Sequence, residues 1–203
     1  MNALLSSAYF GPVQWYQKLH RYNKCIIEQY DNYTKQTYRN RCIIAASDGP
    51  LALTVPVKRS DKGKQLMRDT LISDHGEWRK QHWNAITSAY GQSPYFKYYA
   101  DSLRPFFLRR YKFLIDMNTE ITRAVCSLIG IQPDIMLSEN YVDASDADVD
   151  DFRDAINPKH PASDPTFSPL PYYQVHARKD RFLPNMSIID LLMNEGPEAI
   201  FFL

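Results

Sequence analysis

The spacing of the apolar residues changes near Gly76, and this change constrains the fold more than any other feature of the chain. Before it, short apolar runs separated by turn signals predict strands. After it, apolar residues recur at intervals of three and four, which is typical of amphipathic helices. A chain of 203 residues that contains both kinds of segment is expected to be an α/β protein.

The first part of the chain contains strand-like segments at residues 3–10, 24–30, 38–46 and 51–57, and a shorter one at 67–73. Pro12 fits the first turn of a helix over residues 13–21, between the first two strands. The turn Ser47-Asp48-Gly49-Pro50 predicts that the third and fourth strands form an antiparallel hairpin. We therefore expect a central mixed sheet, partly antiparallel, packed by two to three helices.

Helical spacing dominates the second part. One helix is expected over residues 78–90, and a long one near residues 102–129, where apolar positions alternate in steps of four and three up to a capping Gly130. Residues 136–142 could add a strand, and Ser187 opens a short helix that Gly196-Pro197 ends.

Residues 143–171, by contrast, are rich in Asp and Pro and offer little apolar surface to offset the entropy of ordering. We interpret this segment as an irregular acidic loop within one domain spanning residues 1–203, and leave open whether it covers a functional site.

The charge is distributed unevenly along the chain. The total is +1, but residues 1–130 hold 19 Lys and Arg against 10 Asp and Glu, and the rest of the chain holds 5 against 13. Near-neutrality argues against a dedicated nucleic-acid binder. The basic part is compatible with a site for a small anionic or sugar ligand.

Several function classes lack the residues they need. Only 7 glycines are present, and they form neither G-x-G-x-x-G nor a Walker-type loop. No C-x-x-C or H-E-x-x-H occurs, so we predict no metal and no cofactor. Three dispersed cysteines and the lack of an apolar run of membrane-spanning length lead us to expect a cytoplasmic protein without a membrane span.

The densest polar cluster is the segment KQTYRNR at residues 35–41. On a strand, Arg39 and Arg41 would share one face, where two guanidinium groups fit a phosphate or carboxylate. The alternative is that they are solvated or pair with Glu28 and Asp31 on a neighbouring strand. As candidate substrate-binding residues we take Lys35, Tyr38, Arg39, Asn40 and Arg41.

Two further polar residues lie on apolar helical faces. His82 is a candidate general base, because histidine titrates near neutral pH, or it is a core residue satisfied by hydrogen bonds. Asn118 interrupts the apolar seam of the long helix, so its amide either joins an internal network or reaches a ligand.

Several segments together resemble the WbqC-like protein family: SSAYFGPVQWY at residues 6–16, YTKQTYRNR at 33–41, LTVPV at 53–57, the stretch from Trp78 through His82-Trp83 to Tyr90, and FLPNMSIIDLLMNEGP at 182–197. The order and spacing of these segments carry the resemblance, which runs over nearly the whole chain except the acidic loop. The chain departs from the family where many members have Gln-Pro after the first strand, because Ser7-Ala8 stands there.

The resemblance implies a role in the biosynthesis of surface polysaccharide of the O-antigen kind, and we expect a group transferase that acts on an activated or acidic sugar. In this hypothesis the arginines bind the anion, Asn40 and Asn118 orient hydroxyl groups, and His82 is the base. The alternative is a non-catalytic interaction or accessory protein of envelope biosynthesis. Convergence of the candidate residues on one concave site would favour the enzyme.

Overall fold

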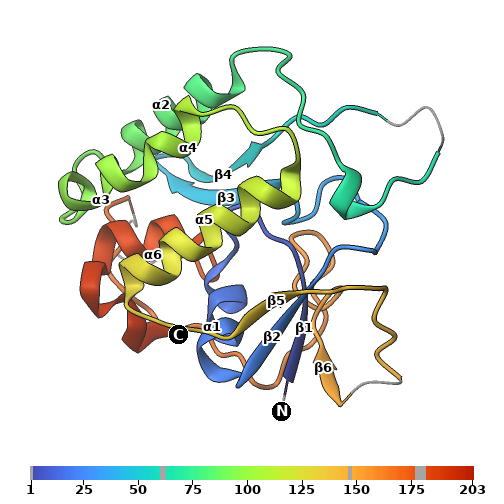
Figure 1. The fold of residues 1–203 in the computed structure, drawn as a ribbon. Coiled ribbons are helices and arrows are strands. Elements are labelled where there is room, and N and C mark those ends of the chain that lie inside the picture. The colour runs from blue at the N-terminus through green and yellow to red at the C-terminus, as the bar shows by residue number, and fades with distance from the viewer. Residues whose placement is uncertain (1, 60–62, 146–147, 177–181) are drawn as a thin grey trace.

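A four-stranded parallel sheet forms one part of the molecule. In the computed structural model, which describes residues 2–59, 63–145, 148–176 and 182–203, its strands are β1 (Asn2–Ser6), β2 (Lys24–Glu28), β5 (Ile135–Leu137) and β6 (Val149–Asp151). The order across the sheet is β5-β2-β1-β6, and every neighbouring pair is parallel (Figure 1). The mixed α/β class is confirmed. The expectation that the central sheet is partly antiparallel is wrong.

The first crossover explains why the sheet is parallel. Helix α1 (Val13–Arg21) follows Pro12 and connects β1 to β2, as parallel neighbours require. The middle three residues of β1 are fully buried, so this strand lies inside the protein core.

The predicted hairpin is present but stands apart from the parallel sheet. Strands β3 (Arg41–Ala46) and β4 (Gly49–Thr54) pair only with each other and are antiparallel. Gly49 has φ 116°, which is the left-handed region that the turn needs and that glycine adopts without strain. The hairpin packs on the helices at residues 78–90 and 188–195 instead of extending the sheet.

Helix α2 (Trp78–Tyr90) agrees with the sequence prediction, but the long helix does not exist as one element. It is divided into α3 (Phe96–Leu103), α4 (Pro105–Leu108) and α5 (Leu114–Ile129). Between α4 and α5 the backbone pairs with residues 70–72: Ile72 N donates to Lys112 O at 3.0 Å, and Leu114 N donates to Thr70 O at 2.9 Å. These bonds take the backbone groups that a continuous helix would use.

The partner segment also differs from its prediction. Instead of a strand over residues 67–73 it forms a short 3-10 helix, η1 (Met67–Asp69), followed by isolated bridges.

Two helix ends were predicted correctly: Gly130 caps α5 with φ 84°, and the Ser187 side chain accepts from Ile189 N at the start of α6 (Ile188–Glu195). The 3-10 helix η2 (Gly196–Phe202) follows α6.

The acidic segment is irregular for most of its length but contains β6, which pairs with β1 at the edge of the sheet. Residues 146–147 of the segment lie outside the described part of the chain. None of the helices in the described residues is long and apolar enough to cross a bilayer.

Candidate functional site

The carboxyl ends of the four parallel strands meet at one edge of the sheet, below the hairpin (Figure 1). From β1 the chain adds β2 and β5 on one side and then places β6 on the other side of β1. Such a reversal of strand order opens a crevice at the carboxyl edge, and this is where α/β sheets bind their ligands. The side chains that follow each strand therefore form the candidate site.

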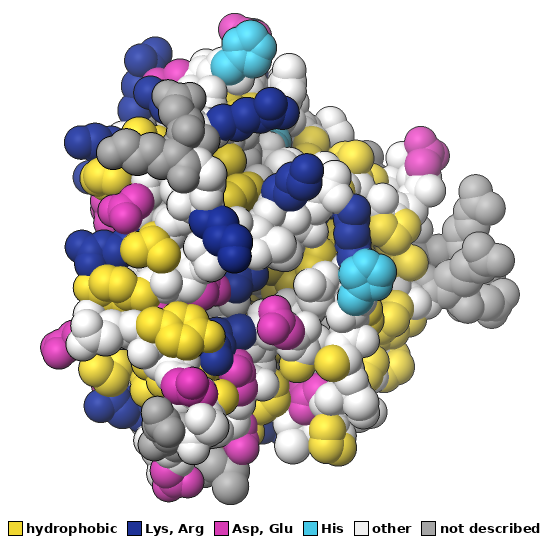
Figure 2. Space-filling model, turned by 90° about the vertical axis from the view of Figure 1, so that its right-hand side faces the viewer, with side chains coloured by type: hydrophobic (Ala, Val, Ile, Leu, Met, Phe, Trp, Pro, Cys, Tyr) yellow, Lys and Arg dark blue, Asp and Glu magenta, His cyan; other side chains and the backbone are white. Residues whose placement is uncertain are grey.

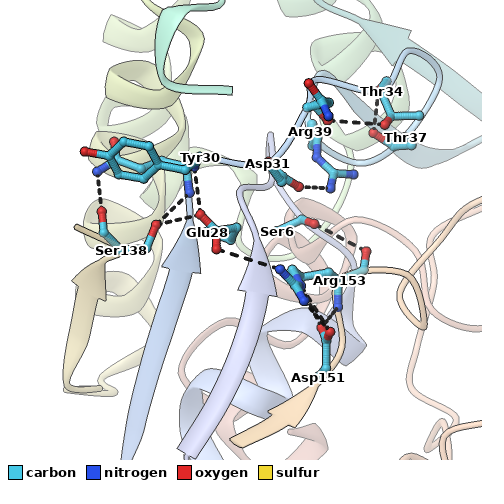
Figure 3. Close-up of polar contacts among 12 residues, drawn as sticks. Ser6, Glu28, Tyr30, Asp31, Thr34, Thr37, Arg39, Ser138, Asp151 and Arg153 are labelled. Atoms are coloured by element: carbon cyan, nitrogen blue, oxygen red, sulfur yellow. Dashed lines mark hydrogen bonds and ion pairs between the residues drawn. The ribbon is translucent and has the colours of Figure 1, made fainter. Parts of the chain in front are cut away.

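Glu28, at the end of β2, is fully buried and organises this edge. Its Oε1 accepts hydrogen bonds from Ser138 Oγ and from Tyr30 N, both at 2.7 Å (Figure 3). Its Oε2 accepts from Val142 N at 2.8 Å. One carboxylate thus holds the loops after β2 and β5 in fixed positions.

Arg153 lies just after β6 and reaches toward the same carboxylate. Its Nη1 is 3.7 Å from Glu28 Oε2, and its Nη2 donates to Asp151 at 2.7 Å (Figure 3). The hydrogen bonds with Asp151 raise the pKa of Arg153, although burial opposes them. Ser6, at the end of β1, donates to the Arg153 carbonyl at 3.3 Å, so β1, β2 and β6 are joined through their carboxyl ends.

Asp31 and Arg39 form a second ion pair at this edge, between Oδ2 and Nη2 (Figure 3). Both side chains are nearly buried, at 12% and 7% exposure. Burial raises the pKa of Asp31, and the neighbouring guanidinium of Arg39 only partly offsets this effect. Arg39 Nε and Asp31 Oδ1 have no hydrogen-bond partner among the described residues.

Asn118, from α5, ties this pair to the end of β1. Its Nδ2 donates to Ser7 Oγ and to the Arg39 carbonyl, both at 2.8 Å. Asn40 Nδ2 donates to Val55 O at 2.8 Å. The Oδ1 atoms of Asn40 and Asn118 are buried and lack partners within the described structure. Buried polar atoms are rarely left unpaired, so four of them in and around one loop identify a place that is built for a ligand or for ordered water.

Two small cavities flank the residues that follow β1. One, of about 40 Å³, is lined by Ser7, Trp15, Asn118 and Thr122 among others, and the second, of about 10 Å³, by Ser7, Trp15, Arg39 and Asn157 among others. Asn157 belongs to the acidic segment, which therefore contributes to the wall of this site. Cavities of this size hold one to a few water molecules.

The structure brings together three of the predicted site residues, Arg39, Asn40 and Asn118. They meet although Arg39 is not on a strand: β3 begins only at Arg41, so the prediction that Arg39 and Arg41 share a strand face is wrong. The turn over residues 38–40 buries Arg39 instead. Its pairing with Asp31 confirms one part of the alternative, but Asp31 lies after β2 and not on it, and Glu28 pairs with Arg153.

The other residues of that cluster lie around the site without entering its network. Lys35 is exposed in a turn. Arg41 Nε donates to Thr54 Oγ1 at 3.0 Å, across the hairpin. Tyr38 is buried, which raises the pKa of its hydroxyl to about 12, and its carbonyl accepts from Tyr9 N at 2.9 Å.

His82 is placed in the core between α2 and the segment after β1. Its Nδ1 is 2.9 Å from Tyr9 Oη, and its ring also has a hydrogen bond to the backbone of Thr54. Burial lowers the pKa of His82 to about 4. The imidazole is therefore neutral at pH 7 and has partners for its nitrogens, as in the alternative of a satisfied core histidine; its role as a base stays a prediction.

Sequence reasoning did not select Ser7, Glu28, Asp31, Ser138 or Arg153 as site residues. Each of these residues ends or follows a parallel strand, and this position was the signal by which the sequence could have identified it. Among the described residues, no three His, Cys, Asp or Glu side chains are grouped so that they could hold a metal ion.

The surface above this edge is polarised. Figure 2 shows the face on the right-hand side of Figure 1, with Lys and Arg side chains over much of its upper half and Asp and Glu side chains concentrated in its lower half.

Comparison with known proteins gives a family and an uncharacterised relative. A sequence model of the WbqC-like protein family matches residues 7–158 and 164–201, and the interruption falls in the acidic segment. The chain is 30% identical, over 189 residues, to "Uncharacterized protein Rv1507c" of Mycobacterium tuberculosis, and the match covers 82% of this chain and 81% of the relative. No solved structure matches the chain.

Proposed function

We propose that this chain, which belongs to the WbqC-like protein family, is a group transferase that acts on an activated or acidic sugar at the carboxyl edge of its parallel sheet, in the biosynthesis of surface polysaccharide. One observation carries the proposal: four buried polar atoms, on Asp31, Arg39, Asn40 and Asn118, lack partners among the described residues. Hydrogen bonds from Asn118 to Ser7 and to the Arg39 carbonyl, and the Asp31–Arg39 ion pair, connect the residues Asp31, Arg39 and Asn118 to the end of β1.

The chemistry of these atoms suggests the kind of ligand. Arg39 Nε is a donor, and the Oδ1 atoms of Asp31, Asn40 and Asn118 are acceptors. A ligand that satisfies them must supply several donors and at least one acceptor. A sugar supplies hydroxyl donors, and a phosphate or carboxylate on it supplies an oxygen that the guanidinium prefers.

Asp31 is the residue best suited to move a proton in this proposal. Burial raises the pKa of its carboxyl group toward neutrality, which makes a carboxylate a stronger base. In the transfer step, the acceptor's hydroxyl or amino group loses its proton to Asp31 and forms a bond to the transferred group. The bond from that group to the donor's leaving group breaks, and Arg39 stabilises the negative charge that the leaving group retains.

The small size of the cavities sets a condition on binding. Because the enclosed spaces hold only water-sized groups, the sugar ring has to lie outside them, and the turn over residues 38–40 has to move before the unpaired atoms can reach a ligand. We therefore expect ligand binding to order this turn in a new position.

A ligand screen followed by two matched variants tests the proposal. Nucleotide sugars and acyl donors are screened by thermal shift, and hits are measured by calorimetry and by mass-spectrometric detection of the product. Arg39→Lys should weaken binding of the sugar ligand by about tenfold or more, because lysine lacks the planar guanidinium group that donates two parallel hydrogen bonds. Asp31→Asn should abolish turnover while binding persists. Arg109→Ala, at an exposed arginine outside the site, is the matched control and should bind as wild type does. If no ligand shifts the melting temperature, or if Arg39→Lys binds as well as wild type, the proposal is wrong.

Non-catalytic binding is the second candidate, and the small cavities together with the satisfied His82 favour it. It predicts that a sugar or anionic ligand binds, that Arg39→Lys weakens the binding, and that no product forms with any donor. Detection of product that Asp31→Asn fails to make would exclude this candidate.

A further inference from the structure

Helices α2 and α4 lie away from the carboxyl edge, on the part of the molecule that holds the hairpin (Figure 1). A groove lies between these two helices. Its volume is about 440 Å³. Its walls combine cationic side chains with apolar ones: Arg79, Lys80, Arg104, Trp83, Phe107 and Leu108. A concave surface with this combination fits a ligand that has an anionic head and an apolar body.

Arg79 is the residue that most needs such a ligand. Its Nη1 donates to Asp74 Oδ1 at 2.7 Å, and its side chain is only 14% exposed. Its Nε and Nη2 are buried and find no acceptor in the described part of the chain. These two nitrogens form the edge of the guanidinium that can bind two oxygens of a phosphate or carboxylate at once. Because both atoms are buried and the guanidinium lies over the Trp78 ring, 4.4 Å from its centroid, the Arg79 side chain has to turn toward the groove to bind a ligand.

The charge of the groove indicates how much negative charge it can take. Arg79, Lys80 and Arg104 line it together with one carboxylate, Glu77, which leaves an excess of two positive charges. The charge of Asp74 does not cancel this excess, because Asp74 is shared between Arg79 and Arg110. An excess of two matches a dianion, and a phosphate monoester carries nearly two negative charges at neutral pH.

The start of α2 supports the same conclusion. Its N-cap residue, Glu77, makes no side-chain capping hydrogen bond and lies 3.6 Å from Lys80, and its first turn carries Arg79 and Lys80 but no acidic residue. Cations at this end are unfavourable with respect to the helix dipole, and a bound anion would reverse that effect.

The apolar wall distinguishes an organic phosphate from an inorganic one. Leu108 is 69% exposed at the edge of the groove, and Trp83 and Phe107 pack against each other with ring centroids 5.5 Å apart. We propose that the groove between α2 and α4 binds a phosphate monoester with an aliphatic or aromatic body, with Arg79 gripping the phosphate and the Trp83–Phe107–Leu108 wall contacting the body.

The test is calorimetric titration of the full-length chain with four probes: octyl phosphate, octyl sulfate, octanol and inorganic phosphate. Octyl phosphate should bind more tightly than each of the others by about tenfold or more, because only it offers both two charges and a tail. Absence of octyl phosphate binding, or equal affinity for inorganic phosphate or octanol, would overturn the proposal.

Variants assign the binding to the groove. Arg79→Lys keeps the positive charge but removes the planar guanidinium group, which can bind two oxygens at once. It should therefore lower the affinity for octyl phosphate by about tenfold. Arg104→Gln, at an exposed position that tolerates change, should lower the affinity for both phosphates. Leu108→Ser should weaken the binding of octyl phosphate but not of inorganic phosphate, which has no tail. Lys97→Ala, an exposed cation of α3 outside the groove, is the control and should change nothing. Wild-type affinity in both Arg79→Lys and Arg104→Gln would refute the site.

The outcome is independent of the function proposed for the carboxyl edge, because the two places share no residue. Octyl phosphate binding that persists in Arg39→Lys belongs to the groove. If octyl phosphate binding is lost in Arg39→Lys but retained in Arg79→Lys, the ligand binds at the carboxyl edge and this inference is overturned.

Discussion

Lys18 Nζ lies 2.6 Å from Asp164 Oδ2, and the two side chains are 0% and 3% exposed. The pair joins helix α1 to the acidic segment. Lys18 also donates to Gln17 Oε1 at 2.9 Å and to Thr166 Oγ1 at 2.7 Å, so all three protons of the ammonium group have acceptors. This ion pair fixes a segment that its composition suggested was partly mobile.

Removing one partner of this pair should destabilise the protein strongly. Lys18→Met leaves Asp164 buried without its cation, and we expect a loss of about 3 kcal/mol in the free energy of unfolding, measured in urea. The double variant with Asp164→Leu should lose less than Lys18→Met alone, because no uncompensated charge remains. A double variant that is as unstable as the sum of its single variants would show that the two residues do not interact.

Asp164 should also make stability depend on pH in the acid range. Burial acts to raise its pKa, but hydrogen bonds from Lys18, Gln14 and Thr166 outweigh burial and lower the pKa to about 2. The folded carboxylate therefore stabilises the protein above about pH 4, the ordinary pKa, and this contribution of about 2–3 kcal/mol is lost as the pH falls toward 2. Urea unfolding of Asp164→Asn should show a shallower loss across that window than wild type, and parallel curves would contradict the assignment.

His82 should make the free energy of unfolding depend on pH over a higher pH range than Asp164 does. The pKa of His82 is about 4 in the folded protein because of burial, whereas the unfolded chain takes up a proton near pH 6.5. Its contribution is fully present above about pH 6.5 and falls by about 3 kcal/mol as the pH drops to 4. His82→Gln should remove this dependence. His75→Gln, at an exposed position, is the control and should leave the wild-type profile unchanged.

The His82→Gln variant also distinguishes a structural role of His82 from a catalytic one. If His82 only fills the core, His82→Gln loses stability through Tyr9 but keeps ligand affinity and turnover at neutral pH. A turnover loss of about a hundredfold or more in folded protein would instead support the role of general base.

Gly196 should tolerate no side chain. It has φ 57°, and a Cβ there would meet the ring of Tyr95 at 2.5 Å. Gly130 has φ 84° with nothing within 4 Å of such a Cβ. Gly130→Ala should therefore cost about 1 kcal/mol from backbone strain alone, and Gly196→Ala about 2–3 kcal/mol or more. Thermal unfolding of both variants gives the comparison, and equal losses would mean that Tyr95 moves aside.

Local signals in the sequence predicted the elements whose stability is local. The hairpin from residues 41 to 54 follows its turn, α2 follows its apolar spacing, and the ends at Gly130 and Ser187 follow known capping preferences. The same signals could not reveal the break between α4 and α5. Apolar spacing continues across it, and only pairing with residues 70–72 draws the backbone out of the helix.

For the candidate site, the sequence by itself determined the chemistry of the parts: an arginine-rich cluster and one amide on an apolar helix face. The tertiary structure decided which parts meet. Asp31 and Arg39 pair, Asn118 reaches Ser7 and the Arg39 carbonyl, and His82 stays in the core. The physical reason is that residue type and spacing set local conformation, whereas contacts between distant residues depend on strand order. The pairing of β6 with β1 is decided by burial and hydrogen bonding over the whole sheet.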